Sequence, residues 1–260
     1  MSEVKSANRV MDILNLLSEL PGGMSLSAIS ESLNLPKSSA HEILHAMVEK
    51  NYLQLDSMRY RVGIKVFEIG QTVSRNLSIL QAVRPHLKSA SEKLRAVTQF
   101  GVLDETEVVY LSKMQFQEGI TLESRVGTRF PAHITAIGKA MLSILPEEEV
   151  IARYSGKEFH HFTRNSIGSV EELLTNLRGA RATSYAQDIE ECTEGVFCLS
   201  VPIPNAGQKT AYAISVSMSR ERWNEVEHGS VVRILESTAR NISENMAQQL
   251  NSKVRALHVS

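Results

Sequence analysis

The sequence predicts an α+β protein in two parts, a small helical domain followed by a larger domain with an antiparallel sheet. Through most of the first 97 residues the apolar side chains recur at spacings of three and four, as on the buried face of a helix. From Gln99 onward they alternate or cluster in short runs, as in strands. A chain of 260 residues is long enough for two cores. We place the first domain at 1–63, a linker helix at 64–79 and the second domain at 80–260.

Three helices are predicted before residue 50, and their apolar positions are Val10, Ile13, Leu14, Leu17 and Leu20, then Leu26, Ile29 and Leu33, then Ala40, Ile43, Leu44, Met47 and Val48. Ser25 can cap the second helix with its hydroxyl, Asn34 tolerates the left-handed conformation that ends a helix, and Pro36 suits the first turn of the third. The connection between the last two helices is therefore short. This is the pattern of a helix-turn-helix, whose second helix enters the DNA major groove by its N-terminal end.

A hairpin is predicted directly after the third helix, because residues 52–55 and 60–62 alternate around a polar turn at 56–59. A helix-turn-helix followed by a hairpin is typical of a winged helix-turn-helix. The candidate DNA contacts are the polar residues at the start of the third helix and two cations of the hairpin, namely Lys37, Ser38, Ser39, His41, Glu42, Arg59 and Arg61.

Charge gives this domain no bulk affinity for DNA. Residues 1–75 contain eight basic and eight acidic side chains, and the whole chain has a formal net charge of -1. DNA binding would therefore need a few placed cations and two or more copies, because one neutral module releases few counterions. Two amphipathic helices with a proline turn also occur in helical domains that bind no DNA, so periodicity alone leaves both interpretations open.

The elements of the second domain follow from the same periodicities. A linker helix is expected at 64–76 and another helix at 80–97, with Pro85 near its start. Strands are expected at 100–103, 108–111, 196–203 and 211–217, and the turn residues at 204–207 join the last two into a hairpin. Helices are expected at 135–145, 146–154, 169–182 and 225–256.

One helix start in this domain has the composition of an anion site. Thr135 can act as the N-cap. The free N–H groups of Ala136, Ile137 and Gly138 would then favour a carboxylate or a phosphate through hydrogen bonds and the helix dipole. A solvent-exposed helix start without a ligand is the alternative.

Polar groups near the last strands form a second candidate ligand site. Residues 185–191 are a polar cluster, and strand alternation puts Cys198 on one face with Ser200, and Ser215 on one face with Ser217. Small polar groups on an otherwise apolar sheet face suit a pocket that orients a polar ligand. They could equally be core hydroxyls that are satisfied internally.

Composition also bears on other classes of protein. Cys192 and Cys198 fit neither a disulfide framework nor a metal site, so we expect buried free thiols, no metal and no cofactor. The N-terminus lacks an apolar signal core and no run reaches the roughly 18 apolar residues of a membrane span, which predicts a cytoplasmic protein. No triad spacing supports an enzyme in which Cys198 acts as the nucleophile and His133, or His160 with His161, acts as the base.

Four segments, in order along nearly the whole chain, resemble the isocitrate lyase regulator (IclR) family of bacterial transcriptional regulators. They are LPKSSAH at 35–41, YRVG at 60–63, AHITAIGKA at 132–140, and EE at 190–191 with GVFCLSVPI at 195–203. The resemblance implies a winged helix-turn-helix, a linker helix and a GAF-like effector-binding domain. It further implies a dimer, or a tetramer made of two dimers, that represses or activates operons in response to a ligand that is usually a small or aromatic carboxylate.

The same resemblance, carried over residue by residue, implies effector contacts at several positions that the residue patterns had already indicated. These are the backbone of Ala136 and Ile137, and the side chains of Asp188, Cys198, Ser215 and Ser217. It also implies that Leu122, Phe130 and Val196 line the apolar side of the pocket.

Two positions depart from the family pattern. Glu42 stands where an Arg commonly follows the His of the recognition helix, and a carboxylate can accept a hydrogen bond from a cytosine amino group, so we expect a different operator preference. Ser184 stands where the family tends to have a glycine, so the loop that leads to Asp188 is expected to differ in shape. A DNA-binding protein whose second domain only oligomerises stays open as an alternative.

Overall fold

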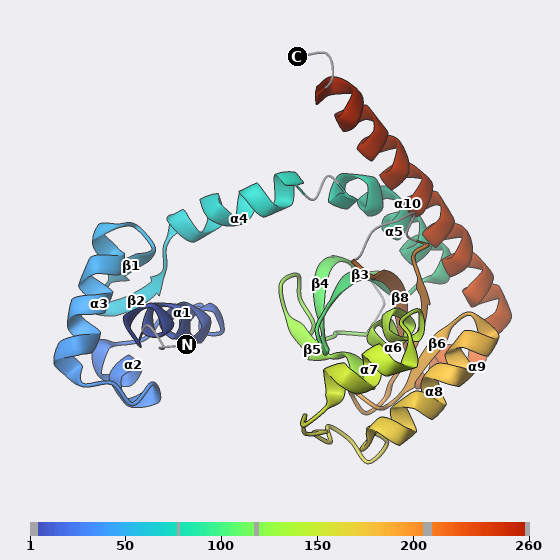
Figure 1. Ribbon diagram of the computed structural model, residues 1–260, viewed down its shortest axis with the longest axis horizontal. Coiled ribbons are helices and arrows are strands. Elements are labelled where there is room, and N and C mark those ends of the chain that lie inside the picture. The colour runs from blue at the N-terminus through green and yellow to red at the C-terminus, as the bar shows by residue number, and fades with distance from the viewer. Residues whose placement is uncertain (1–4, 77–78, 117–119, 205–209, 258–260) are drawn as a thin grey trace. The chain divides into compact units, whose positions relative to one another are not determined.

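The computed structural model describes residues 5–76, 79–116, 120–204 and 210–257, and the chain divides into two compact units, Met1–Leu77 and Ser78–Ser260 (Figure 1). The first unit contains the predicted helix-turn-helix, wing and linker helix. Its elements are α1 (Lys5–Ser18), α2 (Leu26–Ser32), α3 (Lys37–Glu49), β1 (Leu53–Asp56), β2 (Arg59–Val62) and α4 (Ile64–Asn76).

The turn between α2 and α3 has the predicted cap and left-handed residue, but its proline lies one position earlier relative to α3 than expected. The Ser25 hydroxyl accepts a hydrogen bond from the backbone N–H of Ala28 at 3.3 Å, which caps α2. Asn34 adopts the left-handed conformation with φ 49°. Pro36 lies one residue before α3 rather than inside its first turn, because its extended backbone makes it the N-cap residue.

The wing is a hairpin with a two-residue turn. Ser57 and Met58 both have positive φ, 50° and 62°, which matches the type I′ geometry that fits the twist of paired strands. Tyr60 and Met24 exchange backbone hydrogen bonds of 3.0 and 2.7 Å, which tie the wing to the segment after α1. Leu20, predicted on the buried face of the first helix, is 42% exposed because α1 ends at Ser18.

The second unit is built on an antiparallel sheet of six strands in the order β5-β4-β3-β8-β7-β6. The strands are β3 (Val97–Asp104), β4 (Glu107–Met114), β5 (Arg129–Pro131), β6 (Ala186–Ile189), β7 (Val196–Pro202) and β8 (Tyr212–Ser219). The helices are α5 (Ile79–Leu94), α6 (Ala136–Ser143), α7 (Glu147–Tyr154), α8 (Val170–Thr183), α9 (Arg220–Glu225) and α10 (His228–Leu257).

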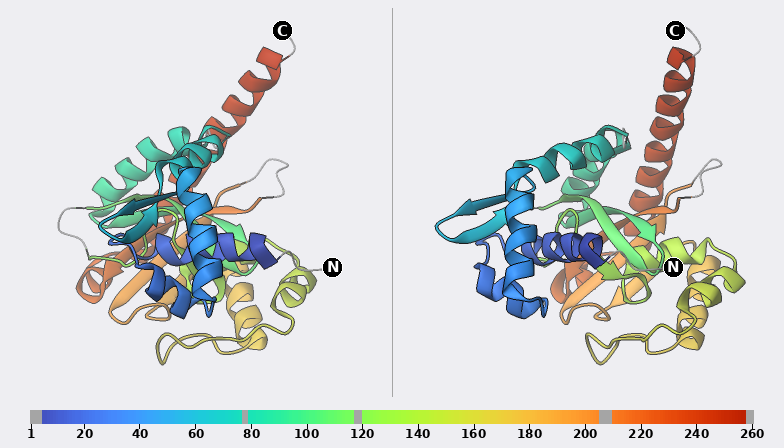
Figure 2. Two further views of the ribbon diagram at one scale, coloured as in Figure 1. Left: turned by 90° about the vertical axis from the view of Figure 1, so that its left-hand side faces the viewer. Right: turned by 60° about the vertical axis from the view of Figure 1, so that its left-hand side comes forward.

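Helices cover both faces of this sheet. On β3, the Thr98 hydroxyl donates to the carbonyl of Leu87 in α5 at 3.0 Å, whereas the neighbouring Gln99 points to the opposite face, where α6 packs. α5 and α10 therefore lie on one face and α6 on the other, with α8 beside α6 (Figure 1). α10 continues past the edge of the sheet towards the C-terminus (Figure 2).

Several predicted ends in this unit were wrong. Val97 was expected to end a helix, but α5 stops at Leu94 and Val97 begins β3, because Arg95 takes a left-handed conformation with φ 52°. Residues 186–189, expected only as a polar cluster, form the edge strand β6, and β5 was not predicted. The helix expected at 225–256 is α10, which begins three residues later, at His228, because Val226 is extended; the short helix α9, which ends at Glu225, was not predicted.

The pairing of β7 with β8 confirms the predicted hairpin, although residues 205–207 of its expected turn lie outside the described residues. Ser200 is fully buried, and its hydroxyl donates to the carbonyl of Ile214 at 2.7 Å, so for this serine the internally satisfied core hydroxyl was the correct alternative. In the described part of the chain, every helix is too short or too polar to span a membrane.

Candidate functional site

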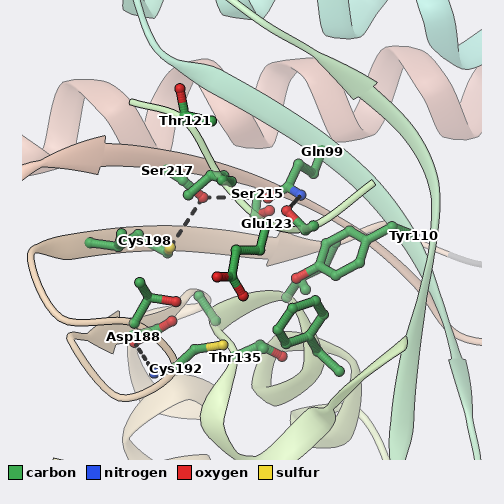
Figure 3. A pocket seen from close by; sticks show the side chains of 17 residues that line it. Gln99, Tyr110, Thr121, Glu123, Thr135, Asp188, Cys192, Cys198, Ser215 and Ser217 are labelled. Carbon is green, nitrogen blue, oxygen red and sulfur yellow. Dashed lines mark hydrogen bonds between the residues drawn. The ribbon is translucent and has the colours of Figure 1, made fainter. Parts of the chain in front are cut away.

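A cavity of about 190 Å³, which we call the α6 pocket, lies between the sheet and the N-terminal end of α6 (Figure 3). The structure brings together in its lining all nine residues expected to contact an effector, namely Leu122, Phe130, Ala136, Ile137, Asp188, Val196, Cys198, Ser215 and Ser217. Thr135, expected as the N-cap of the anion site, also lines it. Sequence reasoning did not assign the other lining residues to a ligand site, and these are Gln99, Tyr110, Thr121, Glu123, Ser124, Cys192 and Thr193.

The start of α6 presents unpaired donors to this pocket. The Thr135 hydroxyl caps the helix by accepting a hydrogen bond from the N–H of Gly138 at 3.2 Å, so Gly138, expected to be free, is already satisfied. The N–H groups of Ala136 and Ile137 find no acceptor among the described residues. A Cβ on Gly138 would lie 2.3 Å from the carbonyl oxygen of Ala132, so only glycine lets the chain turn this tightly into α6.

A chain of polar side chains crosses the sheet side of the pocket (Figure 3). The Cys198 thiol and the Ser217 hydroxyl are 3.1 Å apart, and the Ser217 hydroxyl donates to Gln99 Oε1 at 3.4 Å. Gln99 Nε2 in turn donates to the Ser124 hydroxyl at 2.8 Å. Four separate segments therefore share one hydrogen-bonded wall, which can orient a polar ligand.

Asp188 is the acidic group at the other side of the pocket. Its Oδ1 accepts hydrogen bonds from the backbone N–H groups of Glu191 at 2.7 Å and Cys192 at 3.4 Å. Burial, and then the negative charge of Glu191, raise the pKa of Asp188 to about 7. A carboxyl that is partly protonated at neutral pH can donate a hydrogen bond to an incoming carboxylate.

A buried ion pair joins α6 to the loop that holds Asp188. Lys139 Nζ lies 2.6 Å from both carboxylate oxygens of Glu191 and 3.3 Å from Asn176 Oδ1. The Lys139 side chain is only 1% exposed and that of Glu191 10%. The backbone N–H of Glu191 holds Asp188, so this pair positions one wall of the pocket relative to the helix start. Neither amphipathic periodicity nor strand alternation indicated it.

The sequence contained a usable signal for two of the unpredicted lining residues. Gln99 and Tyr110 lie in strands, and alternation along each strand puts them on the face that α6 covers. The segment 121–124 has no periodicity, and only the fold brings it to the pocket.

The enzyme alternative finds little support in the geometry. Burial raises the pKa of the Cys198 thiol well above its usual value, and the charge of Asp188 raises it further, so the thiol stays neutral and unreactive. His133 is buried against the rings of Tyr154 and Phe159 and does not line the α6 pocket. Within the described ranges no three His, Cys, Asp or Glu side chains form a group that could hold a metal.

The candidate DNA contacts fall into two structural groups. Lys37, Ser38, His41 and Glu42 are exposed on the first turns of α3, and Ser39 beside them is half-buried. The two arginines of the wing contact the protein itself: Arg59 Nη1 donates to the carbonyl of Gly23 at 2.9 Å, and Arg61 Nε to that of Gly22 at 3.4 Å. Arg61 also lies 3.6 Å from Asp56.

Ser184 retains the backbone conformation that a glycine would favour. It ends α8 in the left-handed region with φ 65° and leads directly into β6, which carries Asp188. A serine pays steric energy there that a glycine would not.

Known families match both units. Residues 6–57 match the IclR helix-turn-helix domain, and residues 71–244 match the C-terminal domain of the bacterial transcriptional regulator IclR. The chain is 32% identical over 245 residues to the HTH-type transcriptional regulator KdgR of Dickeya chrysanthemi, covering 94% of this chain and 80% of that protein. It is 32% identical over 229 residues to XynR of Escherichia coli K12, covering 87% and 91%.

Solved structures agree with these matches. The IclR of Thermotoga maritima superimposes with a TM-score of 0.75 at 27% identity, covering 94% of this chain and 99% of that one. An IclR homolog of Microbacterium hydrocarbonoxydans, solved with 4-hydroxybenzoate, has the same fold, with a TM-score of 0.83 at 23% identity and the same coverage. With family matches across both units and relatives that are transcriptional regulators, this chain belongs to the IclR family of bacterial transcriptional regulators.

Proposed function

We propose that this regulator binds operator DNA through the N-terminal end of α3, and that a small organic acid in the α6 pocket changes its affinity for that DNA. One observation carries the ligand half of the proposal: the residues with unpaired N–H groups, Ala136 and Ile137, line a pocket of about 190 Å³. Two donors and the positive end of the helix dipole favour a carboxylate at this point. The homolog that binds 4-hydroxybenzoate supports an acid of this size, aromatic or short-chain.

The DNA half rests on α3. Lys37 offers a cation to a phosphate, and the exposed His41 and Glu42 can meet base edges in the major groove. Because residues 1–75 have no net charge, we propose that the regulator acts as a homodimer, or as a tetramer of two dimers, with one recognition helix for each half-site. Its place of action is the cytoplasm, where its DNA is.

For an acid to control DNA affinity, the protein must have two arrangements, and the acid must bind one of them more tightly than the other. An acid that bound both equally would change nothing, however tight its binding. We assign the change to the effector unit, Ser78–Ser260, and its transmission to the linker helix α4, which moves paired recognition helices to a different spacing.

The test begins with DNA selected from a random pool by the purified full chain. Affinity for that DNA is then measured with and without each member of a panel of small and aromatic acids that has been screened by thermal shift. The proposal expects at least one acid that stabilises the protein and changes DNA affinity severalfold. Equal affinities at saturating acid would contradict it. They would favour the alternative in which the second unit only oligomerises.

A substitution tests the position of the acid. Ala136→Pro removes one N–H at the first residue of α6, where proline is tolerated, and Thr135 already has the extended backbone (φ −112°, ψ 139°) that precedes a proline. A lost hydrogen bond to a charged group weakens acid binding about tenfold or more. Val170→Pro makes the same change at the start of α8, outside the pocket, and should leave acid affinity unaltered. Acid affinity that survives in Ala136→Pro would place the acid elsewhere.

A further inference from the structure

The charged side chains that line the α6 pocket have one sign. Glu123 and Asp188 are acidic, and the described lining contains no Lys, Arg or His. A bound acid therefore finds N–H groups and hydroxyls for its own carboxylate, but no cation to balance it. A plain acid would bring its negative charge beside the Glu123 carboxylate, and it would offer no hydrogen-bond donor to that carboxylate or to the oxygens of Asp188.

Glu123 has no hydrogen-bond partner among the described residues, and because it is exposed, solvent hydrates its carboxylate until a ligand displaces that water. Its side chain points into the space that the other lining residues surround (Figure 3), and no described residue donates a hydrogen bond to it or pairs with it. The Lys113 ammonium donates to the backbone carbonyls of the two residues that flank Glu123, those of Leu122 at 3.2 Å and Ser124 at 2.9 Å, and does not pair with the Glu123 carboxylate.

The segment that bears Glu123 is held in place. Besides the two bonds from Lys113, the Ser124 hydroxyl accepts from Gln99 Nε2 at 2.8 Å, which fixes the segment to β3. Glu123 therefore lies between two anchored residues. Its carboxylate is presented to the pocket by a supported backbone.

The two carboxyl groups act on the same region of the pocket. Burial raises the pKa of the Cys192 thiol to about 12, and the charges of Asp188 and Glu123 both contribute. Asp188 uses Oδ1 for two backbone N–H groups, and among the described residues its Oδ2 accepts no hydrogen bond. Both carboxyl groups therefore line the same pocket as the free N–H groups at the start of α6 (Figure 3).

We propose that the α6 pocket selects small acids that also carry hydrogen-bond donors, hydroxyl or ammonium groups, and that Glu123 is the residue that imposes this selection. The inference rests on the proposed function, because it specifies which acids that pocket takes. The donors satisfy Glu123 and Asp188 while the carboxylate of the same molecule lies on the Ala136 and Ile137 N–H groups. A cavity of about 190 Å³ suits a molecule somewhat larger than benzene, since a cavity of about 150 Å³ holds that ring.

The experiment compares acids that differ only in their donors. Butyrate is set against 2,3,4-trihydroxybutyrate and 4-aminobutyrate, and benzoate against 4-hydroxybenzoate, with affinities measured by calorimetry on the full chain. The proteins are the wild type, Glu123→Gln, and the control Glu158→Gln, whose side chain is 86% exposed and lies outside the pocket. Equal melting temperatures of the three proteins without ligand verify that each is folded.

In the wild type and in Glu158→Gln, at least one donor-bearing acid should bind about tenfold more tightly than its parent, the worth of a hydrogen bond to a charged group. Glu123→Gln should reduce this ratio to about threefold or less, and should tighten the parent acids because one repelling charge is gone. Which derivative gains most tells whether the donor is a hydroxyl or an ammonium group.

Two results overturn the inference alone. One is that parent acids bind the wild type as tightly as their derivatives, and the other is that Glu123→Gln changes all affinities by the same factor. If none of the five acids binds and none affects DNA binding, the proposed function fails together with the inference.

Discussion

Replacing Lys139 by methionine should destabilise the effector unit by about 3 to 5 kcal/mol, the usual effect of removing one partner from a buried ion pair. Lys139 Nζ is 2.6 Å from both Glu191 oxygens, and the two side chains are 1% and 10% exposed. Methionine fills most of the lysine's volume, so the loss comes from the Glu191 carboxylate, which is left buried without a cation.

The stability deficit of Lys139→Met should depend on pH, and the direction of this dependence follows from the pKa of Glu191. Burial already raises the pKa of Glu191, and Lys139 opposes that rise, so in Lys139→Met the pKa increases further. The folded variant then holds a proton that the unfolded chain, with its lower pKa, releases. Stability of the variant therefore falls as pH rises through this window, and its deficit should be larger at pH 8 than at pH 5.

Tryptophan fluorescence is the appropriate assay, because Trp223 is the only tryptophan of the chain and packs against Phe197 in the effector unit. Urea unfolding followed at this residue reports on that unit and avoids mixing two transitions. Lys139→Met/Glu191→Gln is the matched control, since it removes both charges and should recover most of the loss. A deficit below about 1 kcal/mol in the single variant, or one that is equal at both pH values, would refute the reasoning.

The remaining predictions concern other sites. Burial lowers the pKa of His133 to about 4, so the folding stability of the unit is lost as pH falls from about 6.5 towards 4. Relative to the variant His133→Phe, this loss should be about 2 kcal/mol at pH 5. Parallel pH profiles of the two proteins would contradict the prediction. Ser184→Gly should stabilise the unit by about 0.5 to 1 kcal/mol in the same assay, because φ there is 65°; a destabilised variant would show that the serine is not strained. Lys37→Ala should weaken binding to all DNA sequences and flatten its salt dependence, whereas Glu42→Ala should change the sequences recovered by selection, and an identical preference would remove the base-reading role of Glu42.

Local patterns predicted the first unit well because its elements depend on neighbours in sequence. Asn34 ends α2 in the left-handed conformation that its short polar side chain tolerates, and α4 begins and ends where its periodicity does. Prediction failed where two helices or a helix and a strand meet without a strong breaker. Val97 continues the helical spacing of apolar residues, yet the helix ends before Arg95, whose backbone is left-handed, and Val97 is the first residue of β3.

The family motif and strand alternation together predicted nine residues of the α6 pocket, and the structure brings them together. Glu123 could not be predicted in this way. It lies in a segment without periodicity, which is held at the pocket by hydrogen bonds from Lys113 and from Gln99, the latter 25 positions before Ser124 in the chain. The Ser217 hydroxyl finds its acceptor on the same Gln99 from 118 positions away.

The sequence by itself determined the winged helix-turn-helix, the strands of the second unit and the helix start with free donors, because caps, turns and apolar spacing act over a few residues. Only the tertiary structure decided the chemistry around those donors. It buried Lys139 against Glu191, 52 positions away, and placed Asp188 where burial raises its pKa to about 7. Desolvation and charge pairing depend on which segments pack together, and that is a property of the whole fold.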